Sequence, residues 1–142
     1  MTHISKSVKE TSAIAADICS TLKAGKTATV LALYGDLGSG KTTFVQELAK
    51  HLGITDVVQS PTFVIEKIYR ISHNNFSNFI HIDAYRIEQE IELVNLGWKE
   101  LVADPNNLIA IEWADRVEGL LPKDALRIRF KFIDKTTREI RV

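Results

Sequence analysis

Hydrophobic residues recur along the chain with two spacings, one typical of helices and one of strands. Ile14, Ile18 and Leu22 recur every fourth position and Gly25 follows, which predicts an amphipathic helix over residues 11–24. By the same reasoning, helices are predicted over residues 41–52 and 88–101. Apolar or alternating runs predict strands over residues 27–34, 62–71, 78–85 and 108–112.

The connections between these segments favour a sheet covered by helices. The run at residues 27–34 (TATVLALY) is apolar and β-branched, as expected of a buried parallel strand. Only a short polar loop separates the strands at 62–71 and 78–85, which favours an antiparallel hairpin. Residues 125–142 alternate and turn at about 134–136, which predicts a second hairpin. The pattern therefore predicts an α/β three-layer domain with a mixed, mostly parallel sheet and antiparallel hairpins.

Composition narrows the class of protein. The chain has 142 residues, a length that predicts one domain over residues 1–142. Its 18 Lys and Arg balance 18 Asp and Glu, which argues against a chain that binds nucleic acid unaided. The single cysteine, Cys19, is expected to be a buried small side chain in a reducing compartment. No segment has the pattern of a signal peptide or a membrane span, so the expectation is a cytoplasmic protein without membrane contact.

Residues 35–42 (GDLGSGKT) carry the strongest chemical signal, a G-x-x-x-x-G-K-[ST] pattern between a predicted strand and a predicted helix. Glycines let the backbone turn its N–H groups toward one anion, and the helix N-terminus adds a positive end. The lysine is expected to reach the β- and γ-phosphates and the threonine hydroxyl to ligate Mg²⁺. The predicted fold is thus P-loop NTPase-like. The loop residues expected to bind nucleotide are Leu37, Gly38, Ser39, Gly40, Lys41, Thr42 and Thr43.

Two carboxylates are candidates for the metal-binding acid that such a site needs at the end of an apolar strand. Asp83 ends the run FIHID and Glu112 ends the run LIAIE. The pattern does not decide which of them contacts Mg²⁺. His81 shares a strand face with Asp83 and has no neighbouring cysteine or histidine at ligand spacing, so a hydrogen-bonding or core role is expected instead of zinc binding.

The absence of other motifs favours one kind of nucleoside triphosphatase. No N-K-x-D sequence occurs, the element that Ras-like GTPases use to read guanine, so ATP is favoured over GTP. No insertion is long enough for the lid of a small-molecule kinase. Pro61-Thr62 follows the second helix, at a place where switch NTPases sense the γ-phosphate with a threonine hydroxyl. Arg86 follows Asp83 in the sequence. It is a candidate for an arginine finger supplied by this chain itself, or for a partner in a surface ion pair.

Four ordered motifs resemble those of the TsaE family, formerly called YjeE. They are GDLGSGKTTF at residues 35–44, SPTF at 60–63, HIDAYR at 81–86 and IEW at 111–113, and the resemblance spans nearly the whole chain. It implies a small ATPase of the machinery that makes threonylcarbamoyladenosine at position 37 of tRNAs reading ANN codons. It also implies the partners TsaB and TsaD, with tRNA reached only indirectly through that complex.

The resemblance also implies roles for individual residues. Lys41 would hold the phosphates, Thr42 and Glu112 would ligate Mg²⁺, and Asp83 would act beside them through water or on the attacking nucleophile. Thr62 would be the switch threonine, and Trp113 and Thr11 would contact the nucleotide. The cofactors are then ATP and Mg²⁺, hydrolysis is expected to be weak without partners, and the free chain is expected to be a monomer or weak homo-oligomer. Two alternatives stay open at this point, a nucleotide-gated binding module and a small-metabolite kinase.

Overall fold

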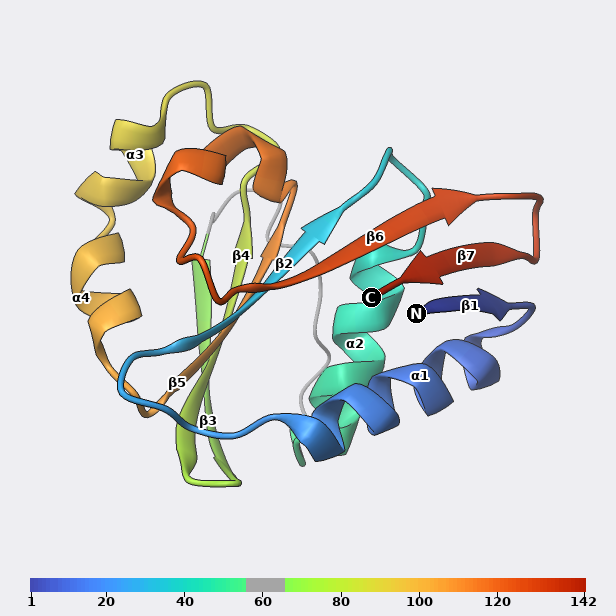
Figure 1. Ribbon diagram of the computed structural model, residues 1–142, viewed down its shortest axis with the longest axis horizontal. Helices are drawn as coiled ribbons and strands as arrows, with labels where there is room; N and C mark the ends of the chain where they lie inside the picture. The colour runs from blue at the N-terminus through green and yellow to red at the C-terminus, as the bar shows by residue number, and fades with distance from the viewer. Residues whose placement is uncertain (56–65) are drawn as a thin grey trace.

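One sheet runs through the whole of the computed structural model, which describes residues 1–55 and 66–142. Helices cover both faces of this sheet (Figure 1). The strand order among the described residues is β1-β7-β6-β2-β5-β4-β3. The strands are β1 (Thr2–Ser5), β2 (Thr29–Tyr34), β3 (Glu66–His73), β4 (Phe76–Asp83), β5 (Asn107–Glu112), β6 (Leu126–Phe132) and β7 (Arg138–Arg141).

Parallel pairing is confined to the centre of the sheet. There β2 lies between β6 and β5, and β4 lies beside β5, all in parallel. The edges are antiparallel, because β3 pairs with β4, β7 with β6 and β1 with β7. The predicted mixed sheet and both predicted hairpins are confirmed, with three parallel and three antiparallel pairings in the described part of the chain.

Two layers of helices enclose the sheet, as predicted for a three-layer α/β fold (Figure 1). The first layer consists of α1 (Val8–Thr21) and α2 (Lys41–His51). The second consists of α3 (Glu90–Asn95), α4 (Trp98–Ala103) and the 3₁₀ helix η1 (Ala114–Leu120). Among the described helices, none combines the length and the apolar composition that a membrane span requires.

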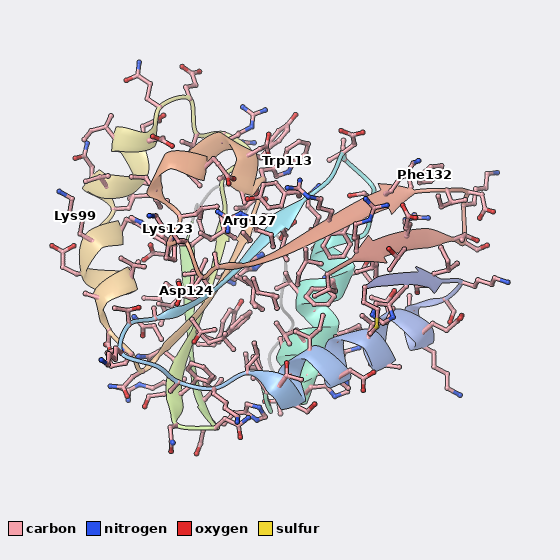
Figure 2. The ribbon with its side chains drawn as sticks, viewed as in Figure 1. Lys99, Trp113, Lys123, Asp124, Arg127 and Phe132 are labelled. Atoms are coloured by element: carbon pink, nitrogen blue, oxygen red, sulfur yellow. The ribbon has the colours of Figure 1, made fainter. Side chains whose placement is uncertain are left out.

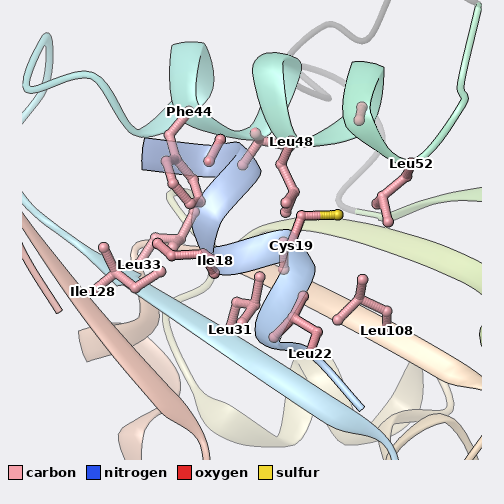
Figure 3. Close-up of a cluster of buried hydrophobic side chains, with 14 of the residues drawn as sticks. Ile18, Cys19, Leu22, Leu31, Leu33, Phe44, Leu48, Leu52, Leu108 and Ile128 are labelled. Carbon is pink, nitrogen blue, oxygen red and sulfur yellow. The ribbon is translucent and has the colours of Figure 1, made fainter. Parts of the chain in front are cut away.

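Each face of the sheet has its own apolar core. Along β2, Leu31 and Leu33 point to the first layer, whereas Val30 and Ala32 point to the second. Figure 3 shows the first core, where side chains of α1 and α2 meet those of β2, β5 and β6. Cys19 is 3% exposed within it, so its predicted burial is confirmed. Each large apolar side chain buried in this way contributes about 1.5–3 kcal/mol, and together they fix the strand ends that carry the site.

Several predicted elements differ from those in the structure. Helix α1 begins at Val8, because the Ser7 hydroxyl caps it by accepting a hydrogen bond from the Glu10 amide at 3.1 Å. The helix predicted over residues 88–101 is two short helices, since Gly97 lies between them with φ of 92°. Strand β1 was not predicted, because its four residues show no clear alternation and pair only with the distant β7. Residues 62–65 of the predicted strand 62–71 lie outside the described residues.

Candidate functional site

The glycine-rich loop joins the buried strand β2 to the first turn of α2. Gly35 has φ of 148°, and a Cβ added to it would lie 2.6 Å from the Phe130 carbonyl oxygen. Only glycine therefore fits at the exit of β2. Gly40 has φ of 105° and occupies the N-cap of α2, whose first residue is Lys41. The loop thus delivers Lys41 and Thr42 to a helix N-terminus, where backbone N–H groups favour an anion.

Lys41 is buried beside this loop. It is 4% exposed, and its ammonium donates to the carbonyl oxygens of Gly35 and, at 2.9 Å, of Asp36. The same nitrogen lies 4.2 Å from the centroid of the Trp113 ring, a cation–π contact. Burial lowers the pKa of Lys41, while nearby carboxylates, chiefly that of Glu112, act in the opposite direction. A buried ammonium held by neutral carbonyls and a ring is a group that an anionic ligand can pair with.

The two predicted strand-end carboxylates meet beside Lys41 and Thr42. Asp83 and Glu112 are direct neighbours in the parallel ladder between β4 and β5. Glu112 is 2% exposed, and its Oε1 accepts a hydrogen bond from Thr42 Oγ1 at 2.8 Å. Its Oε2 lies 2.6 Å from His81 Nε2, so both carboxylate oxygens have a partner. His81 therefore has the hydrogen-bonding role that was predicted for it.

Asp83 has a more open environment than its neighbour. It is half-buried, and its Oδ1 accepts a hydrogen bond from the Tyr85 amide at 3.0 Å. The Tyr85 ring lies 5.0 Å from the Trp113 ring, and the Arg116 guanidinium lies 5.4 Å and 5.7 Å from these two rings. Trp113 itself has φ of 57°, which turns the chain sharply after Glu112 into η1. Figure 2 labels its side chain at this end of the sheet.

The glycine-rich loop and the ends of β4 and β5 line a cavity of about 930 Å³. Every predicted site residue in the described part of the chain lines it, whereas Thr62 lies outside the described residues. The predicted residues that line the cavity are Thr11, Leu37, Gly38, Ser39, Gly40, Lys41, Thr42, Thr43, Asp83, Glu112 and Trp113, and Arg86 joins them.

Two further segments line this cavity, residues 5–8 between β1 and α1, and Lys135, Thr136 and Arg138 around the turn before β7. Near the first segment, sequence reasoning predicted a nucleotide contact for Thr11, but it missed the second segment. These segments meet because β1 pairs with β7, a long-range contact with no local signal. The Ser7-x-x-Glu10 pattern was a local clue, because a serine N-cap at Ser7 would have placed the start of α1 near the site.

The oxygen atoms grouped here fit a Mg²⁺ ion that is shared with a phosphate. The Thr42 hydroxyl and the Glu112 and Asp83 carboxylates line the same cavity, and Mg²⁺ takes hard oxygen ligands. No cluster of three or more His, Cys, Asp or Glu residues in the described ranges could hold a metal by itself. Mg²⁺ is commonly held by one or two carboxylates together with substrate phosphates, and the two carboxylates here match the protein's share of that donor set.

The mixed sheet, its helical layers and the strand–loop–helix around Lys41 define a P-loop NTPase-like α/β fold. The family described as "Threonylcarbamoyl adenosine biosynthesis protein TsaE" matches residues 5–140, and the chain belongs to this family.

Known proteins of this family align with the chain over most of their length. A tRNA threonylcarbamoyladenosine biosynthesis protein TsaE from Bacillus subtilis is 41% identical over 132 residues, which cover 93% of this chain and 78% of the relative. A protein of the same name from Rickettsia typhi is 36% identical over 137 residues, covering 96% and 90%. The crystal structure of Bacillus subtilis YdiB superposes with a TM-score of 0.77 at 34% identity, covering 99% of this chain and 82% of that one. The predicted family is thereby confirmed.

Proposed function

We propose that the protein is a Mg²⁺-dependent ATPase that serves threonylcarbamoyladenosine formation at position 37 of tRNAs reading ANN codons. One observation carries this proposal. The glycine-rich loop with Lys41 and Thr42 lies beside two strand-end carboxylates, and all of these residues line a single cavity of about 930 Å³. Membership of the TsaE family supplies the biosynthetic context.

Phosphate binding falls to the loop and its helix. The first backbone N–H groups of α2 have no carbonyl partner within the helix, and the helix dipole there also favours negative charge. Lys41 would exchange its carbonyl partners at Gly35 and Asp36 for phosphate oxygens. Such an exchange replaces neutral acceptors by charged ones, so it strengthens the hydrogen bonds of a buried ammonium.

The metal would be held by Thr42 and Glu112, with Asp83 beside them. When bound, Mg²⁺ neutralises charge on the β- and γ-phosphates and so stabilises the transition state of phosphoryl transfer. Glu112 already accepts a hydrogen bond from Thr42, so the chain holds these two donors together in advance. Asp83 would orient the attacking water and accept its proton. The role of Thr62 as a γ-phosphate sensor stays a prediction from the sequence resemblance.

The nucleoside would extend toward the N-terminal end of the cavity. Thr11, predicted to contact the nucleotide, is 6% exposed there, and Ser5 Oγ lies 2.7 Å from its hydroxyl. Val8 adds an apolar side chain and Lys135 a cation on the opposite wall. An apolar cleft with a few polar groups is typical of a nucleotide site. The sequence lacks N-K-x-D, which favours ATP as the nucleotide.

Two partner proteins are part of the proposed function. We infer that TsaB and TsaD raise the rate of hydrolysis, and that tRNA contacts the ATPase only through that complex. Arg86 is exposed and lines the cavity, so a partner seated on this rim would contact it. A cationic group ordered in this way adds stabilisation to the transition state.

The test is ATP hydrolysis by the full chain with Mg²⁺, measured with and without TsaB and TsaD. We expect slow turnover alone and a clear rise with both partners. A rate that already reaches about 10 per second without partners, a typical enzyme value, would overturn the partner dependence. Phosphate transfer to an acceptor other than water would show a kinase instead. Multiple rounds of tRNA modification by a variant that binds but does not hydrolyse ATP would show a nucleotide-gated module.

A further inference from the structure

A fully buried histidine lies behind the Glu112 carboxylate. His81 occupies β4 two residues before Asp83, and its Nε2 lies 2.6 Å from Glu112 Oε2. The two side chains are 0% and 3% exposed. In the parallel ladder His81 stands beside Ala110 of β5, whose small side chain leaves room for the imidazole to reach Glu112. Water is excluded from this contact, so its geometry is fixed by the protein alone.

The direction of this hydrogen bond follows from its partners. A carboxylate that ligates a metal is ionised and only accepts, so in the proposed site His81 Nε2 would carry the hydrogen and donate it to Glu112. The other ring nitrogen, Nδ1, is buried and has no hydrogen-bond partner among the described residues. Among the described residues, Glu112 is therefore the one hydrogen-bond partner of the imidazole.

We propose that His81 is a positioning residue for the Mg²⁺ site, an inference that rests on the proposed ATPase function. The terminal torsion of a glutamate is broad, so one hydrogen bond leaves the carboxylate free to rotate. With His81 holding Oε2 and Thr42 holding Oε1, Glu112 has one orientation. That orientation keeps Oε1 toward the loop, where the metal would be held. Groups that orient a metal ligand in this way commonly change metal affinity or activity about 10–100-fold when removed.

Two substitutions by side chains of similar size separate the effect of losing the hydrogen bond from the effect of losing the packing. His81→Gln keeps an N–H donor at about the reach of Nε2, whereas His81→Leu fills the space with no donor. Thermal unfolding of each full-length variant checks that it folds. If His81→Leu does not fold, His81→Asn replaces it, because its amide is too short to reach Glu112.

The first readout is the affinity of the ADP complex for Mn²⁺, measured by electron paramagnetic resonance or calorimetry. The second readout is ATP hydrolysis with TsaB and TsaD. We expect His81→Leu to weaken Mn²⁺ binding and lower kcat by about 10–100-fold, with metal-free ADP affinity and KM for ATP changed by less than about threefold. His81→Gln should recover most of both losses. This split separates a positioning role from a merely structural one, which would move all constants together.

Two outcomes overturn the positioning role while leaving the ATPase intact. In the first, His81→Leu matches the wild type in Mn²⁺ affinity and kcat. In the second, His81→Gln is as impaired as His81→Leu, so the donor does not matter. A wild-type chain that neither binds Mn²⁺ with ADP nor hydrolyses ATP refutes the proposed function itself, and the positioning role with it.

Discussion

The ends of β4 and β5 carry neighbouring carboxylates in contrasting surroundings. Glu112 is 2% exposed and has both oxygens bonded, one to Thr42 and one to His81. Asp83 stands next to it in the ladder but is half-buried, with one oxygen on the Tyr85 amide of its own turn. Two residues that look equivalent in the sequence therefore differ in burial, with Glu112 enclosed and Asp83 more accessible.

Under the proposed ATPase function, this difference suits the two groups to different tasks. A metal ligand has to be held in one orientation before the ion arrives, which suits Glu112. A group that orients water and accepts its proton needs access to the cavity, which suits Asp83. The proposed ATPase account therefore predicts that substitutions at the two strand ends fail in different ways.

The largest expected effect is that of Glu112→Gln. The variant keeps the size of the side chain but removes the charge that would ligate Mg²⁺, so kcat should fall by about 10³-fold, equivalent to about 4 kcal/mol. Steady-state ATP hydrolysis with TsaB and TsaD measures it. Glu100→Gln, on the exposed side of α4, is the matched control and should leave the rate unchanged. A fall of less than tenfold in Glu112→Gln would show that Glu112 is not the metal ligand.

Asp83→Asn should have the next largest effect. Asparagine retains an oxygen for the Tyr85 amide but cannot accept a proton, so kcat should fall by about 10²-fold. Mn²⁺ affinity of the ADP complex should stay within about threefold of the wild type, because the metal is held elsewhere. If Asp83→Asn lowered Mn²⁺ affinity as much as Glu112→Gln does, the two carboxylates would not have different roles.

Lys41→Met tests the cation beside the two carboxylates. Removing a buried charge-assisted phosphate contact should weaken binding of a non-hydrolysable ATP analogue by about tenfold to a hundredfold, as measured by calorimetry. Lys50→Met removes an exposed lysine at the other end of α2 and should bind normally. Equal affinity in the two variants would exclude Lys41 from phosphate binding.

The smallest effect is expected at Tyr34, which anchors the segment after Glu112. Its hydroxyl donates to Glu118 of η1, a carboxylate that Arg127 also contacts. Burial first, and then the hydrogen bond to Glu118, raises the pKa of Tyr34 from 10.0 to about 12. The folded state therefore retains a proton that the unfolded state loses, so the stabilisation is complete below pH 10 and declines as pH rises toward 12.

Tyr34→Phe should accordingly flatten the loss of unfolding free energy between pH 10 and 12, and cost about 1 kcal/mol at neutral pH. Urea unfolding at a series of pH values measures both. Because Tyr34 is outside the cavity lining, kcat should stay within about twofold of the wild type. A deep loss of activity would mean that the orientation of Glu112 depends on η1 as well as on His81.

Local patterns predicted those parts of the site whose signals lie within one segment. The loop and its helix follow from the spacing of glycine, lysine and threonine at residues 35–42, and the two acids follow from apolar runs that end in a carboxylate. The split at Gly97 was hidden, because a glycine within a helical pattern is ordinarily tolerated.

Features that depend on strand order were beyond local prediction. The contact between His81 and Glu112 requires β4 to lie beside β5, although 31 positions separate the two residues. The N-terminal wall of the cavity requires β1 to pair with β7 across almost the whole chain. Such pairings arise from the global packing of the sheet, so the residues give no nearby signal for them.

The most direct test of the central claim is a crystal structure of the chain with Mg²⁺ and a non-hydrolysable ATP analogue. The account predicts phosphates on the loop of residues 35–42, and Mg²⁺ about 2.0–2.1 Å from oxygens of Thr42 and Glu112. Asp83 should lie in the second coordination sphere of the ion, within hydrogen-bond distance of the attacking water. Mg²⁺ bound directly to Asp83 with Glu112 still on Thr42 and His81, or a nucleotide bound outside this cavity, would contradict it.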